Sequence, residues 1–96
     1  MIYDLMDGNK DRAFKDQLQR AAVSIMNNIA EGYESGSDAK YINFLKIAKG
    51  SCSEVRSMMY LCLDRNYCSK EEFEKIKEHS VLISQQLYKL IKYLNN

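Results

Sequence analysis

Apolar residues recur at alternating spacings of four and three through the second half of this chain. From about Asp38 to Arg65 the recurring positions are Tyr41, Leu45, Ala48, Cys52, Val55, Met59 and Cys62. From residue 70 onward they are Phe73, Ile76, Ser80, Ile83, Leu87, Leu90 and Leu94. This heptad-like spacing gives an α-helix one continuous apolar side that packs against other helices. The chain contains no proline, so two long, uninterrupted helices are predicted.

A further long helix precedes these two. Asp11 is suited to be its N-cap, and the helical pattern extends to Tyr33 or Glu34. One apolar stripe of this helix comprises Phe14, Leu18, Ala22, Ile25 and Ile29. A second stripe, displaced around the axis, comprises Val23, Met26, Ala30 and Tyr33. A helix with apolar residues on two sides must be covered on two sides.

Short turns are predicted between the helices. Residues 34–37 form a turn, after which Ser37 or Asp38 caps the next helix. Asn66 suits a left-handed C-cap, and Ser69 with Glu72 forms a capping box for the last helix. Residues 2–6 have helical spacing but are too short to form an independent helix. They are interpreted as the end of a helix that this chain mostly lacks.

Three long helices joined by short turns run antiparallel to their neighbours. The predicted fold is therefore all-α: an antiparallel up-down four-helix bundle with a truncated first helix, in one domain over residues 1–96. Such a bundle leaves one side poorly covered, and its core does not bury all of the apolar stripes. Because monomers rarely expose large contiguous apolar patches, the chain is predicted to form a homo-oligomer.

Composition limits the function. The chain has 14 Lys and Arg against 13 Asp and Glu, which argues against a strongly basic protein that coats nucleic acid. No apolar run has the length of a membrane span, and the N-terminus lacks the apolar core of a signal peptide. We expect a cytoplasmic protein without a membrane partner.

The three cysteines agree with a reducing compartment, because they are odd in number and lack the Cys-x-x-Cys spacing. Cys52 and Cys62 lie on one predicted helix, about 15 Å apart at ~1.5 Å per residue, which is too far for a disulfide. They are interpreted as core side chains. With a single histidine, His79, interpreted as a solvated helix residue, and no Gly-rich phosphate loop, no metal ion, cofactor or small-molecule substrate is predicted.

Two carboxylates, Glu31 and Glu54, interrupt apolar or small-residue stretches. A buried carboxylate needs a partner, and the candidate partners are Arg20, Ser24, Asn27, Asn28, Ser51 and Arg56. A polar contact that ties the two helices together is favoured over acid–base catalysis, so no enzyme is predicted. Gly32 either ends its helix or allows close packing, and Gly50 is expected to admit a neighbouring backbone or side chain.

Basic residues cluster modestly on the first two long helices. The candidate contacts to nucleic acid are Arg12, Lys15, Arg20, Lys46, Lys49 and Arg56. They could touch phosphates, and a symmetric assembly would multiply the effect. A solvated helix surface is the favoured alternative.

Two motifs carry a family resemblance. Residues 20–32 resemble the R-A-A-x-S-I-x-x-N-I-A-E-G signature of the four-helix-bundle family named for the 23S ribosomal RNA intervening-sequence protein. Residues 44–54 are similar to that family's second signature, Phe-Leu-x-x-Ala-x-Gly-Ser-x-x-Glu. Residues 63–73 resemble its turn between the third and fourth helices. Ser24, Asn28, Glu31, Gly32, Gly50, Ser51 and Glu54 are the motif positions expected to serve structure and assembly.

The resemblance implies a ring-like homo-oligomer, typically a pentamer, that acts as an interaction scaffold without enzymatic activity. Members of the family are encoded within inserts in bacterial ribosomal RNA genes and elsewhere. A related branch, the accessory protein of diversity-generating retroelements, is strongly basic and binds nucleic acid, which supplies the alternative function. This chain departs from the pattern through its short first helix and its net charge of +1.

Overall fold

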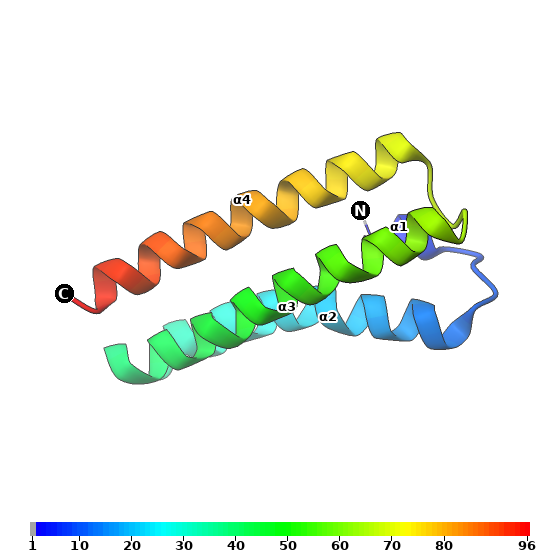
Figure 1. Ribbon diagram of the computed structural model, residues 1–96. Helices are drawn as coiled ribbons and strands as arrows, with labels where there is room; N and C mark the ends of the chain where they lie inside the picture. Colours follow the sequence, from blue (N-terminus) through cyan, green and yellow to red (C-terminus); the bar gives the residue numbers. More distant parts are fainter. Residues whose placement is uncertain (1) are drawn as a thin grey trace.

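A computed structural model describes residues 2–96 of the protein, and these residues form four α-helices (Figure 1). The short α1 spans Ile2–Met6, and it is followed by the long helices α2 (Arg12–Tyr33), α3 (Asp38–Asp64) and α4 (Lys70–Leu94). The prediction of an all-α fold with three long helices and an N-terminal stub is confirmed.

Local hydrogen bonds fix the helix ends. Asp11 accepts a hydrogen bond from the Phe14 N–H at the start of α2, and Ser37 accepts one from the Lys40 N–H at the start of α3. At the start of α4, Ser69 forms a complete capping box with residue 72. Asn66 has a φ of 59° and follows α3 in the predicted left-handed conformation. The predicted caps are therefore confirmed, with Ser37 rather than Asp38 capping α3.

The central helix is α3, which packs along α2 and along α4, while α1 contacts α2 (Figure 1). Successive long helices run in opposite directions, as in an up-down bundle. The described residues extend over 44 × 21 × 16 Å, so the molecule is an elongated rod. The short α1 lies near the end where α3 turns into α4, and it accompanies the long helices over only part of their length.

The heptad-like seam of α3 forms the middle of the core. Leu45, Ala48, Cys52, Met59 and Cys62 are all 0% exposed. The α4 seam is buried at Phe73, Ile76, Ser80 and Leu87, whereas Ile83, Leu90 and Leu94 are only half-buried. The prediction of two core-facing seams is confirmed, and the α3 seam is buried most completely because α3 has a long helix on each side.

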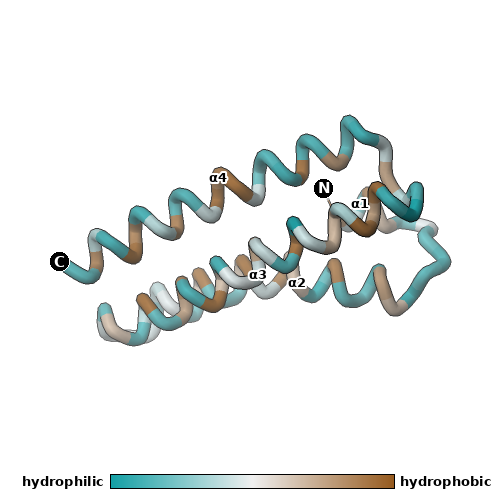
Figure 2. The backbone as a smooth tube through the Cα atoms, in the orientation of Figure 1, coloured by the Kyte–Doolittle hydropathy of each residue, from teal (hydrophilic) through white to brown (hydrophobic). Residues whose placement is uncertain are grey.

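The two stripes of α2 have different surroundings. Phe14, Leu18, Ala21 and Ile25 face the core, so the buried alanine is Ala21 and not the predicted Ala22. The second stripe stays largely uncovered, with Met26 73% exposed and Tyr33 77% exposed. In Figure 2 hydrophobic and hydrophilic segments alternate along each long helix, as expected for helices with an apolar side.

The thiols behave as the core interpretation predicts. Cys52 and Cys62 are buried, Cys68 is half-buried, and all three are free. Burial, together with the neighbouring Cys68, raises the pKa of the Cys62 thiol to about 12. Cys62 is therefore a protonated, unreactive thiol at neutral pH.

Candidate functional site

A pair of serine side chains ties α2 to α3, and an asparagine of α2 bonds to one of them. The Ser51 hydroxyl donates a hydrogen bond of 2.8 Å to Ser24 Oγ. Asn28 Nδ2 donates to both Ser24 Oγ, at 3.0 Å, and the Ser24 carbonyl, at 2.8 Å. Ser51 is 8% exposed, and a hydroxyl buried between two helices needs such a partner. Three of the predicted motif residues are thus brought together, in a contact that is structural.

Glu31 and Glu54 do not take part in this contact. Both residues are exposed, and neither forms an ion pair or a hydrogen bond within residues 2–96. The prediction that these carboxylates tie α2 to α3 is wrong, because their helical positions direct them toward water, where no partner is required. His79 is also exposed, as predicted.

The two glycines of the motifs differ in their surroundings. A Cβ atom on Gly32 would lie 2.8 Å from Tyr41 Cδ1 and 2.9 Å from Phe44 Cβ. Gly32 therefore allows the close approach of α3 to the last turn of α2. A Cβ atom on Gly50 would meet nothing within 4 Å, so the prediction of a close neighbour there is wrong in this chain. Gly50 lies on an exposed surface of α3.

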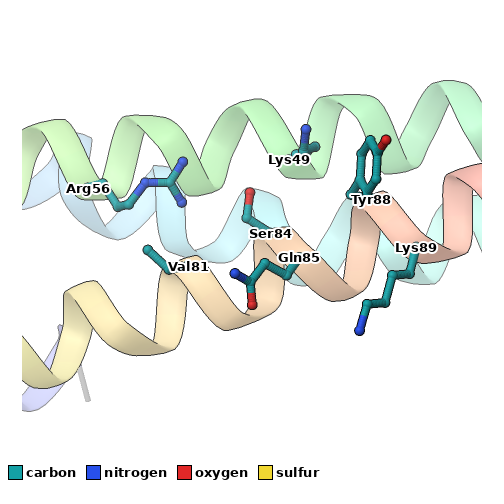
Figure 3. Close-up of a pocket in the computed structure, with 7 residues that line it drawn as sticks. All are labelled: Lys49, Arg56, Val81, Ser84, Gln85, Tyr88 and Lys89. Atoms are coloured by element: carbon teal, nitrogen blue, oxygen red, sulfur yellow. The ribbon is translucent and has the colours of Figure 1, made fainter.

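The candidate basic residues are divided between two helices. Arg12, Lys15 and Arg20 lie on α2, and Lys46, Lys49 and Arg56 lie on α3. The structure brings Lys49 and Arg56 into one groove between α3 and α4, shown in Figure 3, with a volume of about 630 Å³. We call this the cationic groove, and its lining residues are Lys49, Arg56, Val81, Ser84, Gln85, Tyr88 and Lys89.

Arg56 and Lys49 are held in place by contacts within this groove. Arg56 Nη1 donates to the Ser80 carbonyl of α4 at 3.3 Å, and Nη2 donates to Ser53 Oγ at 3.1 Å. Lys49 Nζ lies 5.3 Å from the centre of the Tyr88 ring, within the range of a cation–π contact. No carboxylate is among the lining residues, so the groove is electropositive.

The α4 wall of this groove was not predicted from the sequence. Tyr88 and Lys89 lie between the seam residues Leu87 and Leu90, at heptad positions that point away from the seam. A heptad pattern assigns such positions to solvent, so the sequence carried no signal that these two residues line a groove. The pairing with Lys49 depends on how far α4 is shifted along α3, and no local pattern encodes that shift.

A second groove lies between α1, α2 and α4. Its volume is about 310 Å³, and Val55 of α3 is among the residues that line it. We call it the apolar groove, and its other lining residues are Ile2, Tyr3, Ala22, Val23, Ile25, Met26, Ile76, His79, Ser80 and Ile83. None of these side chains is a carboxylate, a lysine or an arginine. The groove is therefore a surface for apolar contacts.

A polar cluster joins the α3–α4 turn to the start of α2. Tyr67 donates a hydrogen bond of 2.7 Å to Asp11 Oδ2, and Arg65 Nη1 lies 3.4 Å from the same oxygen. The Tyr67 hydroxyl, followed by the Phe14 N–H, lowers the pKa of Asp11 below its ordinary value of 3.8. The cluster therefore links the segment after α3 to the start of α2 at one end of the bundle.

The fold is that of a small all-α bundle protein with two open grooves on its surface. The chain matches the family described as 23S rRNA-intervening sequence protein over residues 1–89, and it belongs to that family. No curated protein matches it.

One solved structure is similar over nearly the whole chain. It is the crystal structure of a protein of unknown function from the S23 ribosomal protein family of Bacteroides thetaiotaomicron. That protein is 30% identical, the TM-score is 0.87, and the match covers 95% of this chain and 81% of the other. The family description names no reaction. No helix among residues 2–96 is long and apolar enough to cross a membrane, and within the same residues no group of His, Cys, Asp and Glu could hold a metal ion.

Proposed function

We propose that this protein is a non-catalytic assembly protein that associates with copies of itself into a ring-like homo-oligomer and acts as an interaction scaffold. The apolar groove is the observation that carries the proposal. It lies where the short α1 leaves the sides of α2 and α4 without a full-length helix between them. The uncovered stripe of α2 continues beside it.

The energetic argument rests on exposed apolar area. Met26 is 73% exposed at the groove and Tyr33 is 77% exposed farther along the same stripe. Burial of apolar surface contributes roughly 25 cal/mol per Å², so covering this face with another protein chain is favourable. A head-to-tail contact between identical chains closes into a ring when the rotation permits it. Five copies are the number that the family resemblance favours.

The polar residues of the family motif support a structural role. Ser51 donates to Ser24 Oγ between the helices, and Asn28 donates to the same oxygen within α2. Their hydrogen-bonding capacity is used within the fold, so they do not form a nucleophile with an adjacent base. We further propose a cytoplasmic location, since buried free thiols such as Cys52 and Cys62 fit a reducing compartment.

Size-exclusion chromatography with light scattering tests the proposal. The wild-type chain should elute as a discrete oligomer at micromolar concentration. Met26→Glu should dissociate it, because a carboxylate buried at the interface has no partner. Leu61→Glu is the matched control, since Leu61 is 46% exposed and lines neither groove. It should keep the oligomer intact.

A wild-type monomer would overturn the proposal. Dissociation by Leu61→Glu but not by Met26→Glu would move the interface away from the apolar groove and overturn the argument from that groove. Circular dichroism of each variant separates dissociation from unfolding.

A further inference from the structure

The cationic groove concentrates positive charge in a chain that is almost neutral overall. Three cations, Lys49, Arg56 and Lys89, line it, and no carboxylate does. The whole chain carries a net charge of +1. A concave surface lined by one sign of charge focuses the field and raises the local concentration of oppositely charged ligands. The ligand that fits this groove is an anion.

The spacing of the cations favours an extended anion. Lys49 and Arg56 lie seven residues apart on α3, which at ~1.5 Å per residue places them about 10 Å apart along the helix axis. At this spacing the two side chains can each contact a different phosphate of one strand. Lys89 adds a cation from α4, and in Figure 3 its side chain extends away from α3.

Arg56 is oriented and still has free donors. Its contacts with the Ser80 carbonyl and Ser53 Oγ hold the guanidinium between α3 and α4. A guanidinium has five N–H donors, so donors remain for a phosphate oxygen after these contacts. Ser84 and Gln85 add neutral hydrogen-bonding groups to the same lining.

Tyr88 distinguishes this groove from a merely basic surface. Its side chain is 56% exposed between the cations, with Lys49 Nζ 5.3 Å from the ring centre. Exposed aromatic rings within a positively charged groove are the platforms on which unpaired bases stack. A duplex hides its bases in its own stack, so the ring favours a single strand.

We infer that the cationic groove binds the phosphodiester backbone of single-stranded nucleic acid, with a base stacked on Tyr88. Lys49, Arg56 and Lys89 contact the phosphates. The inference goes beyond the proposed function, because the groove is complete within one chain and does not depend on assembly.

Fluorescence anisotropy with a labelled oligouridine tests the inference on the full chain. Lys89→Gln is the best single variant, because Lys89 is exposed and forms no ion pair or hydrogen bond within residues 2–96. Affinity at about 50 mM salt should fall several-fold, and the slope of log affinity against log salt should become shallower by about 0.7. Lys70→Gln, at the exposed start of α4, is the matched control with the same charge change.

Equal losses in Lys89→Gln and Lys70→Gln would overturn the inference, since they would mean that net charge alone drives binding. The absence of binding at low salt would also overturn it. Tyr88→Leu should weaken binding several-fold without changing the salt slope, because a base stack carries no charge. An unchanged affinity in Tyr88→Leu would overturn the role of the ring.

Competitors separate the sources of anionic charge. Unlabelled oligouridine should displace the probe. A duplex of the same length, inorganic phosphate, polyphosphate and polyglutamate should each compete at least tenfold more weakly. Equal competition by polyphosphate or polyglutamate would reassign the groove to polyanions in general and overturn the commitment to nucleic acid. Equal competition by inorganic phosphate would overturn the claim that the ligand is an extended anion.

Discussion

The two sides of α2 are packed differently. Toward α3 the helix is closed, because Gly32 allows close approach and Ser24 bonds to Ser51 across the interface. Toward α4 it is open, and Met26 stands 73% exposed at the rim of the apolar groove. The closed side supplies the stability of the single chain. The open side adds little to it, which leaves its apolar residues available for another chain.

The largest expected effect separates the closed core from the open side. Leu45 is 0% exposed, and Leu45→Ala should lower the free energy of unfolding by about 2–5 kcal/mol through lost burial and a cavity. Met26→Ala, at an exposed position, should change it by less than about 0.5 kcal/mol in the dissociated chain. Urea unfolding at low protein concentration measures both. Equal losses would mean that the open side is part of the core.

The next largest effect compares the two glycines. Gly32→Ala should destabilise the protein by about 1–3 kcal/mol, because the new methyl group meets Tyr41 and Phe44 at less than 3.0 Å. Gly50→Ala should stabilise it by up to about 1 kcal/mol, since alanine favours the helix and open space surrounds the position. Thermal and urea unfolding measure whether each substitution lowers or raises the free energy of unfolding. A neutral Gly32→Ala would show that α3 can move away from α2 at little cost.

A smaller effect is expected at the serine contact. Ser51→Ala should cost about 0.5–1.5 kcal/mol, because the hydrogen bond to Ser24 Oγ is lost between helices. Ser57→Ala serves as the control, since Ser57 is exposed on the same helix, and it should change stability by less than about 0.5 kcal/mol. Equal changes in the free energy of unfolding, measured with urea, would show that the polar contact contributes nothing specific to the closed side.

The smallest effect is a pH dependence at the closed end of the bundle. The Tyr67 hydroxyl and the Phe14 N–H lower the pKa of Asp11 in the folded chain. Its stabilising contribution is therefore complete above the ordinary pKa of 3.8 and is lost as the pH falls through the lower folded value. The stability advantage of wild type over Asp11→Asn should shrink as the pH is lowered below about 3.8. If the free energies of unfolding of wild type and Asp11→Asn changed in parallel with pH, the prediction would be contradicted.

Much of the fold could be predicted because its signals are local. The α3 seam, the Asp11 and Ser37 caps and the left-handed Asn66 depend on spacing and on residues within one turn. These features need no knowledge of the neighbouring helix, and all were confirmed.

The site was harder to predict because it depends on how the helices sit against one another. Glu31, Glu54 and Gly50 were assigned to an interface, yet their positions on the helices face solvent. Tyr88 and Lys89 were missed because Tyr88 meets Lys49, and Lys89 joins the same groove, only once α3 and α4 are packed in register. The charge of a groove is a property of two helices together.

The molecular mass of the wild-type protein in solution tests the central claim most directly. Sedimentation equilibrium at micromolar concentration should give a single species whose mass equals that of two or more chains of 11.2 kDa each. The open side of α2 would then be covered by neighbouring copies. A mass of one chain across that concentration range would contradict the account, because the apolar groove would then face water in the functional protein.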